Sequence, residues 1–331
     1  MGGRIMNKKI RSLGFVVLAI MFFFGVQFVE AAEPIVLKAS CFLEKNQPVA
    51  AKVWTWIDRV NNELKGKVEI KYVGGPEVIP VFEQIEAARK GITDISFTAG
   101  AHYAPQLPAA NTFNLSKLMP WEERKSGYFD IMVKEHEKLG VRLMGRWIWG
   151  GFYMWLKDPI KTPAELSGKR LRGHPLYDRF YKALGISSVT IQPSDVYTSL
   201  EKGMVDGTCY GMQGPRELGW TRVVKYIVDH PFYTQNNTVF VMNIDTWNKL
   251  PADIKAKLME ITESFEREMV AYFQEQINKE YDLVKQSGVK PIVFSPPDAK
   301  RFVDLAYEAN WEDLDKKIPD LVPALRKSLG Y

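Results

Sequence analysis

The sequence of 331 residues predicts an α/β fold with two similar lobes. Three observations lead to this prediction. Strand-like and helix-like segments alternate along most of the chain, a short stretch of the first half recurs in the second, and one helical pattern is too long for a single small domain. The composition is that of an ordinary globular protein, with 46% hydrophobic and 25% charged residues. It excludes a disordered chain, a collagen-like repeat and a membrane protein with several spans, and the length suggests about two domains.

The first half of the chain alternates regularly from residue 35 onward. We expect strands at 35–40, 68–73 and 94–98, and amphipathic helices at 49–64 and 78–90 between them. A longer helical pattern at 122–139 ends at Gly140, which suits a left-handed C-terminal cap, and a strand at 141–149 follows it. Strands separated by helices of this length predict a sheet that is covered on both faces.

The second half repeats the scheme with shorter elements, namely a strand at 170–172, a helix at 177–184, a strand at 189–192 and a helix at 194–202. Within it, residues 200–206 (LEKGMVD) resemble residues 88–94 (ARKGITD). Each stretch is a helix end, a capping glycine, two further residues and an aspartate that opens a strand. The pattern Lys-Gly-x-x-Asp is also common helix-stop chemistry. The repeat therefore favours two similar lobes only in combination with the alternation.

The longest helical pattern covers residues 251–287, after a strand at 238–244. Its apolar positions recur every three or four residues without a break, and at 1.5 Å per residue it would reach roughly 55 Å. Such a helix must lie across both lobes or project into a partner. A strand at 289–294 and a helix at 298–314 follow, and no linker rich in glycine and proline divides the chain.

The N-terminus has the pattern of a secretory signal peptide. Four basic side chains between residues 4 and 11 precede an apolar run at 13–29, and small residues at the boundary predict cleavage after Ala31. The alternative is an uncleaved anchor, which the glycines and the glutamine within the run disfavour. Loss of residues 1–31 leaves 40 basic and 38 acidic side chains, a net charge of about +2 in place of +5. An exported, nearly neutral protein has no electrostatic basis for binding nucleic acid.

No motif of catalysis, cofactor binding or metal binding is found. The four histidines lack an H-E-x-x-H or C-x-x-C companion, and the sequence has no G-x-S-x-G elbow, no phosphate-binding G-x-x-x-x-G-K and no G-x-G-x-x-G after a strand. The sequence therefore predicts a protein that is not an enzyme and that holds no metal ion and no cofactor.

Two regions carry binding chemistry instead. Arg172 stands near the end of the strand at 170–172, where an arginine can hold a carboxylate with two parallel hydrogen bonds, although a solvated surface arginine is the alternative. Residues 147–155 place five aromatic side chains around Gly150 and Gly151. These rings either pack in the core or line a cleft where the chain passes between lobes.

Several longer stretches resemble the periplasmic solute-binding proteins of TRAP transporters, often called the C4-dicarboxylate-binding or DctP type. They are 159–172 (PIKTPAELSGKRLR), 181–185 (YKALG), 194–207 (SDVYTSLEKGMVDG), 66–70 (GKVEI), and Leu250 with Pro251. The resemblance implies a two-lobed fold like that of type II periplasmic binding proteins, in which a long helix at about 251–287 spans both lobes. One lobe would comprise 32–149 with 238–265, and the other 150–237 with 266–331. It also implies a periplasmic receptor that delivers an organic acid to a membrane permease.

The resemblance also implies the site. Arg172 occupies the position of the carboxylate-binding arginine, and Tyr210, Pro193 and Asn236 match positions that face the ligand. With the aromatic region and the strand ends, the expected ligand-binding residues are Arg172, Tyr210, Phe152, Tyr153, Trp149, Pro193, Gln213, Asn236, Thr98 and Phe42.

This sequence departs from the family pattern where many members have polar partners. Phe152 stands in place of a second basic residue, Tyr210 replaces a frequent asparagine, and residues 98–100 read Thr-Ala-Gly. A second carboxylate or a polyol would lack hydrogen-bond partners there. The expected ligand is therefore an aromatic or apolar monocarboxylate of the indole or phenyl type. A dicarboxylate or hydroxy acid, an enzyme on the same scaffold and a sensor for a receptor kinase are the alternatives.

Cys41 and Cys209 fall on opposite lobes in this arrangement. A disulfide between them would prevent the hinge motion that binding requires, so two free thiols are expected.

Overall fold

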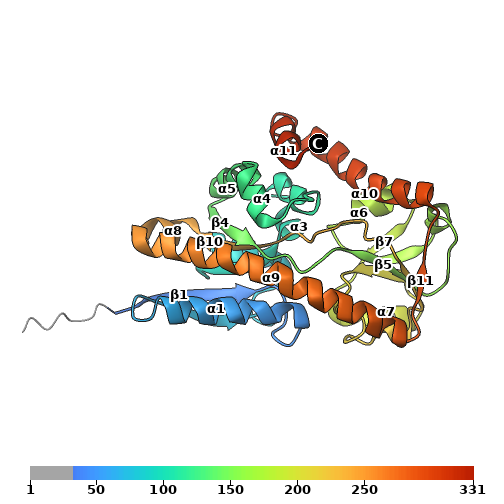
Figure 1. The fold of residues 1–331 in the computed structure, drawn as a ribbon, viewed down its shortest axis with the longest axis horizontal. Coiled ribbons are helices and arrows are strands. Elements are labelled where there is room, and N and C mark those ends of the chain that lie inside the picture. The colour runs from blue at the N-terminus through green and yellow to red at the C-terminus, as the bar shows by residue number, and fades with distance from the viewer. Residues whose placement is uncertain (1–32) are drawn as a thin grey trace, which may run out of the picture. The chain divides into compact units, whose positions relative to one another are not determined.

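The computed structural model describes residues 33–331 and contains two β-sheets with helices packed around them (Figure 1). The signal peptide predicted for residues 1–31 lies outside the described residues. The predicted α/β fold with two lobes is confirmed, since each sheet is the centre of one lobe. No helix within residues 33–331 combines the length and the apolar character that crossing a membrane requires.

The sheet of the first lobe has five strands in the order β2-β1-β3-β10-β4. The strand β1 pairs in parallel with β2 and β3, whereas β10 is antiparallel to β3 and β4. Helices α1, α2, α5 and α9 contact these strands. The bounds are β1 (Ile35–Cys41), α1 (Ala51–Glu63), β2 (Val68–Gly74), α2 (Gln84–Arg89), β3 (Ile95–Ala99), α5 (Tyr128–Lys138), β4 (Val141–Arg146), β10 (Thr238–Asn243) and α9 (Ala252–Gln286).

The sheet of the second lobe has six strands in the order β11-β9-β5-β8-β6-β7. Five of them repeat the first sheet, because β6 is parallel to β7 and β8 while β5 is antiparallel to β8 and β9. The bounds are β5 (Tyr153–Leu156), β6 (Arg170–Gly173), α6 (Asp178–Ala183), β7 (Ser187–Thr190), α7 (Val196–Glu201), β8 (Gly207–Tyr210), β9 (Tyr226–Val228) and β11 (Lys290–Ile292). The repeated sequence stretch thus marks a repeated strand order.

The long helix α9 contacts both lobes, as expected. Its first part packs against α1, α4 (Pro120–Lys125) and β4. Near its end, Glu280 pairs with Arg216 at 2.7 Å and Tyr281 donates a hydrogen bond to Asp229 at 2.8 Å. Figure 1 shows α9 running from α8 (Ile244–Lys249), near the first sheet, toward α7 and β11 of the second.

Several predicted elements differ in extent. The helix expected at 122–139 is two helices, α4 and α5, because Gly127 adopts a left-handed conformation with φ of 81° that interrupts the helical hydrogen bonds. The strand expected at 141–149 ends at Arg146, where the chain crosses to the second lobe, and the strand expected at 189–192 lies at β7, two residues earlier. The strand expected to open at Asp206 is β8. The strands β5 and β9 and the short helices α3 (Gly100–Tyr103), α8 and α11 (Val322–Leu329) were not given bounds in advance.

Two antiparallel segments connect the lobes. The backbone of Trp147 bonds to Thr238, and the backbones of Phe152 and Tyr233 bond at 2.9 Å. Between these contacts, the Asn236 amide accepts a hydrogen bond from the Trp149 N–H at 2.9 Å and donates one to the Trp147 carbonyl at 2.8 Å. This ladder joins the two crossing segments into one narrow ribbon.

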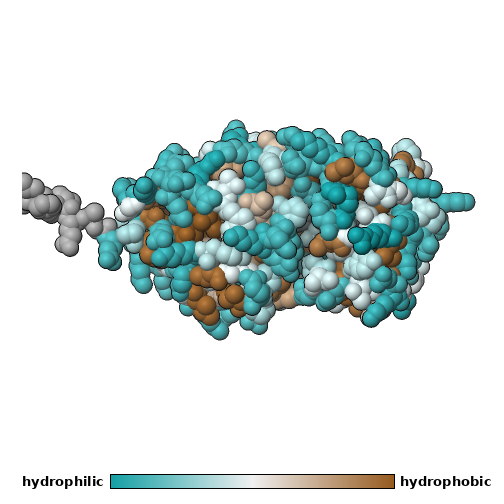
Figure 2. Space-filling view, turned by 90° about the horizontal axis from the view of Figure 1, so that it is seen from below, coloured by the Kyte–Doolittle hydropathy of each residue, from teal (hydrophilic) through white to brown (hydrophobic). Residues whose placement is uncertain are grey.

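The C-terminal helices lie outside the two sheets. Helix α10 (Pro296–Lys317) packs on α6 of the second lobe, whereas α11 packs on α5 of the first. The boundaries given above for the lobes stay a prediction, and α11 is the segment whose contacts depart most from them. Figure 2 shows a face that is mostly hydrophilic with smaller hydrophobic groups between. The exposed large hydrophobic side chains include Val78, Phe82, Ile92 and Met204.

Candidate functional site

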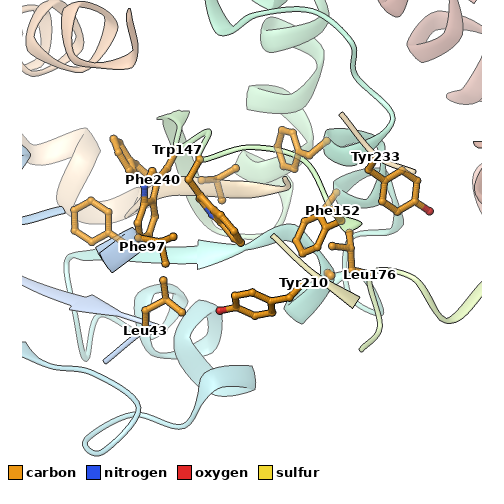
Figure 3. Close-up of a cluster of buried hydrophobic side chains, with 14 of the residues drawn as sticks. Leu43, Phe97, Trp147, Phe152, Leu176, Tyr210, Tyr233 and Phe240 are labelled. Carbon is orange, nitrogen blue, oxygen red and sulfur yellow. The ribbon is translucent and has the colours of Figure 1, made fainter. Parts of the chain in front are cut away.

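A cavity of about 360 Å³ lies between the two lobes and is lined by residues of both. Aromatic side chains make up much of its wall, namely Phe42 and Phe82 from the first lobe, Trp149 from the crossing ribbon, and Phe152, Tyr177 and Tyr210 from the second lobe. Figure 3 shows Tyr210 directed toward Leu43, another residue of the wall, with Phe152 and Leu176 beside it. The shape and chemistry are those of a site for a small apolar molecule with a few polar contacts.

Arg172 is the one lysine or arginine in the wall of this cavity, and only 3% of its surface is exposed. The end of β6 positions it, and two hydrogen bonds fix its guanidinium. The Nε atom donates to the Ile191 carbonyl at 2.7 Å, and Nη1 donates to the Tyr177 hydroxyl at 2.5 Å. That hydroxyl in turn donates to the Cys209 carbonyl at 2.9 Å. No hydrogen bond from Nη2 is found within residues 33–331.

The charge of Arg172 has no counter-ion among the described residues. Arg146 is the other buried arginine of residues 33–331, and it forms an ion pair of 2.6 Å with the equally buried Glu123. A buried charge without a partner is costly, because neither water nor an opposite charge stabilises it. A fixed guanidinium without a counter-ion has the charge to attract an anion, and its planar fork has the geometry to match a carboxylate.

Two histidines also line the cavity. Their Nε2 atoms lie 3.3 Å apart, with His102 on α3 of the first lobe and His174 just after β6 of the second. Burial, and then the charge of Arg172, lowers the pKa of His102 to about 3. Burial also lowers the pKa of His174, with smaller effects from His102 and Arg172. Both imidazoles are therefore neutral at neutral pH, which leaves Arg172 as the positive charge of the wall.

Six of the ten predicted residues line the cavity, namely Arg172, Tyr210, Phe152, Trp149, Pro193 and Phe42. The other four lie elsewhere. Asn236 holds the crossing segments together, and Thr98 is buried in β3, next to the lining residue Ala99. Tyr153 follows Phe152 and points to the opposite face of its strand, and Gln213 is buried outside the cavity wall.

The prediction omitted four residues that contribute aromatic rings to the wall, namely Phe82, His102, His174 and Tyr177. A signal for one of them was present in the sequence. His174 lies two residues after Arg172, so both side chains project from the same face of the extended chain. The positions of Phe82 and His102 depend on contacts between distant segments.

The two cysteines are free and buried on different sheets. Burial raises the pKa of Cys41 to about 12 and also raises the pKa of Cys209. Neither thiol is therefore a thiolate at neutral pH. Residues 33–331 also contain no group of three histidine, cysteine or acidic side chains arranged to hold a metal ion.

Comparisons with known proteins identify the family and the fold. The family described as bacterial extracellular solute-binding protein, family 7 (DctP), matches residues 39–316. The 2,3-diketo-L-gulonate-binding periplasmic protein YiaO of Escherichia coli is 23% identical over 279 residues, which cover 78% of this chain and 80% of that protein.

Solved structures share the fold. The extracytoplasmic solute receptor DctP7 of Bordetella pertussis, which binds pyroglutamic acid, has a TM-score of 0.79 at 16% identity, covering 89% of this chain and 99% of that chain. A TRAP periplasmic solute-binding protein of Desulfovibrio salexigens with bound orotic acid also has a TM-score of 0.79, at 17% identity, with 89% and 98% covered. These relatives are binding receptors, not enzymes. Because the family match covers most of the sequence, the chain belongs to family 7 of the bacterial extracellular solute-binding proteins, the extracytoplasmic TRAP-type receptors for organic acids.

Proposed function

We propose that this receptor binds an aromatic or apolar monocarboxylate, holds its carboxylate on Arg172 and delivers it to a TRAP membrane permease. One observation carries the proposal. Arg172 is buried in the wall of an aromatic cavity, and no carboxylate of residues 33–331 pairs with it. An acid that enters the cavity supplies the missing negative charge.

The surroundings of Arg172 favour a carboxylate over other anions. The bonds to Ile191 and Tyr177 occupy the Nε atom and one N–H of Nη1, so the end of the guanidinium that carries Nη2 stays available. Two parallel N–H groups at this end can bind both oxygens of one carboxylate. Since the two bonds already fix the side chain, little conformational entropy is lost when the ligand binds.

The rest of the cavity favours a single carboxylate on an apolar body. Both histidines are neutral, and the one acid in the wall, Glu44, is exposed and would repel a second carboxylate. Each polar ligand group left without a partner would cost roughly 1–3 kcal/mol. Flat rings can instead pack against Phe42, Trp149 and Phe152. The two structural relatives named above bind pyroglutamic and orotic acid, and both are ring acids with one carboxylate.

Delivery follows from the two-lobed architecture and the family. The narrow ribbon between the lobes can bend, so that the lobes close over the ligand and open again. The predicted signal peptide at 1–31 would send the receptor to the periplasm, where the permease takes over the acid.

A binding screen tests the ligand class. Phenylacetate, indole-3-acetate, succinate and glucuronate are compared by thermal shift, followed by calorimetry. An aromatic acid should stabilise the receptor by roughly 2.7 kcal/mol at a hundredfold excess over Kd. Tight binding of succinate with no binding of either aromatic acid would overturn the proposed class.

Two variants test the anchor. Arg172→Ala should abolish tight binding, while the circular dichroism spectrum stays that of a folded protein. Arg170→Ala is the matched control, because Arg170 is exposed on the same strand and bonds only to the Gly203 carbonyl through its side chain. Equal affinities of wild type and Arg172→Ala would remove Arg172 from the site.

A further inference from the structure

One hydrogen bond joins residues 33–146 of the first lobe to residues 153–228 of the second. It is the contact of 3.3 Å between the Nε2 atoms of His102 and His174. Every other hydrogen bond between the lobes in residues 33–331 involves the crossing ribbon, α9 or the C-terminal helices. The two imidazoles therefore form the polar contact at the side of the cavity that opens when the lobes separate.

Aromatic rings surround this contact on both lobes. His102 lies edge-on to Phe42 and Phe82, with ring centroids 5.0 and 5.2 Å apart. The His174 ring lies 5.8 Å from that of Tyr177 and 6.4 Å from that of Phe82. Aromatic rings thus pack around both imidazoles, of which His102 is buried and His174 is partly exposed.

The backbone determines which nitrogen carries the proton. The Leu176 N–H donates to Nδ1 of His174 at 3.2 Å, so Nδ1 is the acceptor and the proton of His174 is on Nε2. This Nε2–H then donates across the cleft to Nε2 of His102. The proton of His102 is consequently on Nδ1, a buried atom without a hydrogen-bond partner. A second proton on His102 would occupy Nε2 and remove the acceptor of this contact. A second proton on His174 would occupy Nδ1 and remove the acceptor of the Leu176 N–H.

We propose that His102 and His174 are positioning residues that hold the two lobes together over the bound acid, and that ligand affinity falls in acid because protonation of His102 breaks their contact and protonation of His174 breaks its bond to the Leu176 N–H. The inference rests on the proposed function in one respect only, namely that an acid binds in the cavity. It adds the residues that close the cavity and a dependence on pH.

The charges near the pair favour this direction. The nearest cation is Arg172, which faces both imidazoles from β6 and raises the cost of a second positive charge. The acids nearby are Glu44, in the loop after β1, and Asp178, at the start of α6, and neither forms an ion pair with either histidine. The phenols of Tyr177 and Tyr210 are un-ionised in acid. The Asp178 carboxylate lies against the backbone of His174 but forms no ion pair with either imidazole, so protonation gains no ion pair within residues 33–331.

The direction of the pH effect follows from the lowered pKa values. Separation of the lobes would expose both imidazoles to water, where a histidine titrates near the ordinary value of about 6.5. Closure requires the neutral forms, so each imidazole reduces affinity as the pH falls below that value. Between pH 7.5 and 5.5 this amounts to about tenfold for each histidine, or about a hundredfold together.

Calorimetry with phenylacetate tests this dependence, since its carboxyl group stays ionised in this range. The Kd for wild type should rise by about a hundredfold from pH 7.5 to 5.5. His102→Gln keeps an acceptor near the position of Nε2 and cannot be protonated, so its Kd should rise by only about tenfold. The double variant with His174→Asn should show no change. His230→Gln, a histidine that touches neither member of the pair, should behave as wild type. Parallel pH profiles of wild type and the double variant would overturn the proposal.

A second measurement separates this inference from the proposed ligand class. If phenylacetate binds at neither pH, the proposed ligand class fails. The inference about the histidines can still be tested, because the distance between the lobes can be measured without any ligand. Spin labels on Lys65→Cys and Lys202→Cys occupy exposed positions on different lobes, while the native cysteines are buried. The distance between the labels should lengthen from pH 7.5 to 5.5 in wild type but not in the double variant. An unchanged distance in wild type would overturn the inference.

Discussion

Asp94 and Asp206 occupy equivalent positions in the two lobes and make the same three hydrogen bonds. The Asp94 N–H donates to the Lys38 carbonyl, and the Asp206 N–H donates to the Arg170 carbonyl. In return, Oδ2 of each aspartate accepts a hydrogen bond from the N–H of the same partner at 2.8 Å. The carbonyl of each aspartate accepts a third bond, from the N–H of Asn243 or Lys157. Each aspartate therefore ties a parallel strand of its lobe, β1 or β6, to the antiparallel strand, β10 or β5.

Loss of either carboxylate should weaken its own lobe. Asp94→Ala and Asp206→Ala each remove the acceptor of one exposed backbone N–H, at a cost of about 0.5–1.5 kcal/mol in the free energy of unfolding. Asp94→Ala should cost more, because Oδ1 also accepts a hydrogen bond from Thr246 at 2.8 Å. Urea denaturation measures both, and the Asn variants, which keep an acceptor oxygen, are the controls. Midpoints equal to that of wild type would show that the two bonds are dispensable.

Replacement of the ligand anchor should not destabilise the ligand-free receptor. Arg172→Met removes a buried charge that has no carboxylate partner, and a side chain of similar length fills its place. The relief of this cost offsets the loss of the bonds to Ile191 and Tyr177. We expect the thermal midpoint to be unchanged or higher than that of wild type, while acid binding is lost. A clearly lower midpoint would mean that Arg172 is primarily a structural residue.

Much of the fold follows from local sequence, because periodicity and capping act over a few residues. Gly91 and Gly203, which follow the ends of helices α2 and α7, have φ of 70° and 67°, so the repeated stretches form equivalent turns. The break between α4 and α5 was not predicted, because the apolar period continues through Gly127. The strand β5 was hidden within an aromatic run that does not alternate with polar residues.

The site could be predicted only in part for a related reason. Arg172 and the aromatic residues stand out through their chemistry and their place in the sequence motifs. Asn236 stands out in the same way, yet its amide is used entirely by the crossing ribbon. The contact between His102 and His174 joins residues 72 positions apart, and neither segment shows it alone.

The buried pair beside the ribbon should be important for stability. Arg146 bonds to Glu123 at 2.6 Å and reaches the carbonyls of Phe113 and Asn236 through Nη2. Glu123→Gln leaves this arginine buried without a counter-ion, and we expect a loss of about 3–5 kcal/mol in the free energy of unfolding. The pair of Arg59 and Glu268 lies at the surface, so Glu268→Gln should cost at most about 1 kcal/mol. Similar losses in the two variants would contradict this contrast.

Both thiols should be unreactive in the folded protein. Cys41 and Cys209 are fully buried, and burial raises the pKa of both. Ellman's reagent should therefore react with neither thiol in buffer and with both thiols in concentrated urea. The masses of the reduced and non-reduced protein should agree. A difference of two hydrogens would show a disulfide and contradict free thiols.

Glu266 should make the stability of the protein depend on pH in an unusual direction. Its carboxylate is buried in the middle of α9, where Oε1 accepts the Arg146 N–H at 2.7 Å and Arg124 pairs with it at 3.0 Å. Burial outweighs these contacts and raises the pKa of Glu266 from 4.5 to about 7. Between these two values the unfolded chain releases a proton that the folded chain keeps. The contribution of Glu266 to stability therefore falls as the pH rises from 4.5 to 7, by up to about 3 kcal/mol, and is constant above that.

Comparison with Glu266→Gln measures this effect, because glutamine keeps an acceptor oxygen and cannot ionise. The free energy of unfolding of wild type minus that of the variant should decrease from pH 4.5 to 7. Glu268→Gln on the same helix is the matched control. The hydrogen bond from Arg59 lowers the pKa of Glu268, so its contribution is present throughout this range and is lost only in stronger acid. The wild-type minus Glu268→Gln difference should therefore be flat between pH 4.5 and 7. A flat difference for Glu266→Gln as well would mean that Arg124 keeps this carboxylate ionised, and the pKa of Glu266 would then be close to its ordinary value.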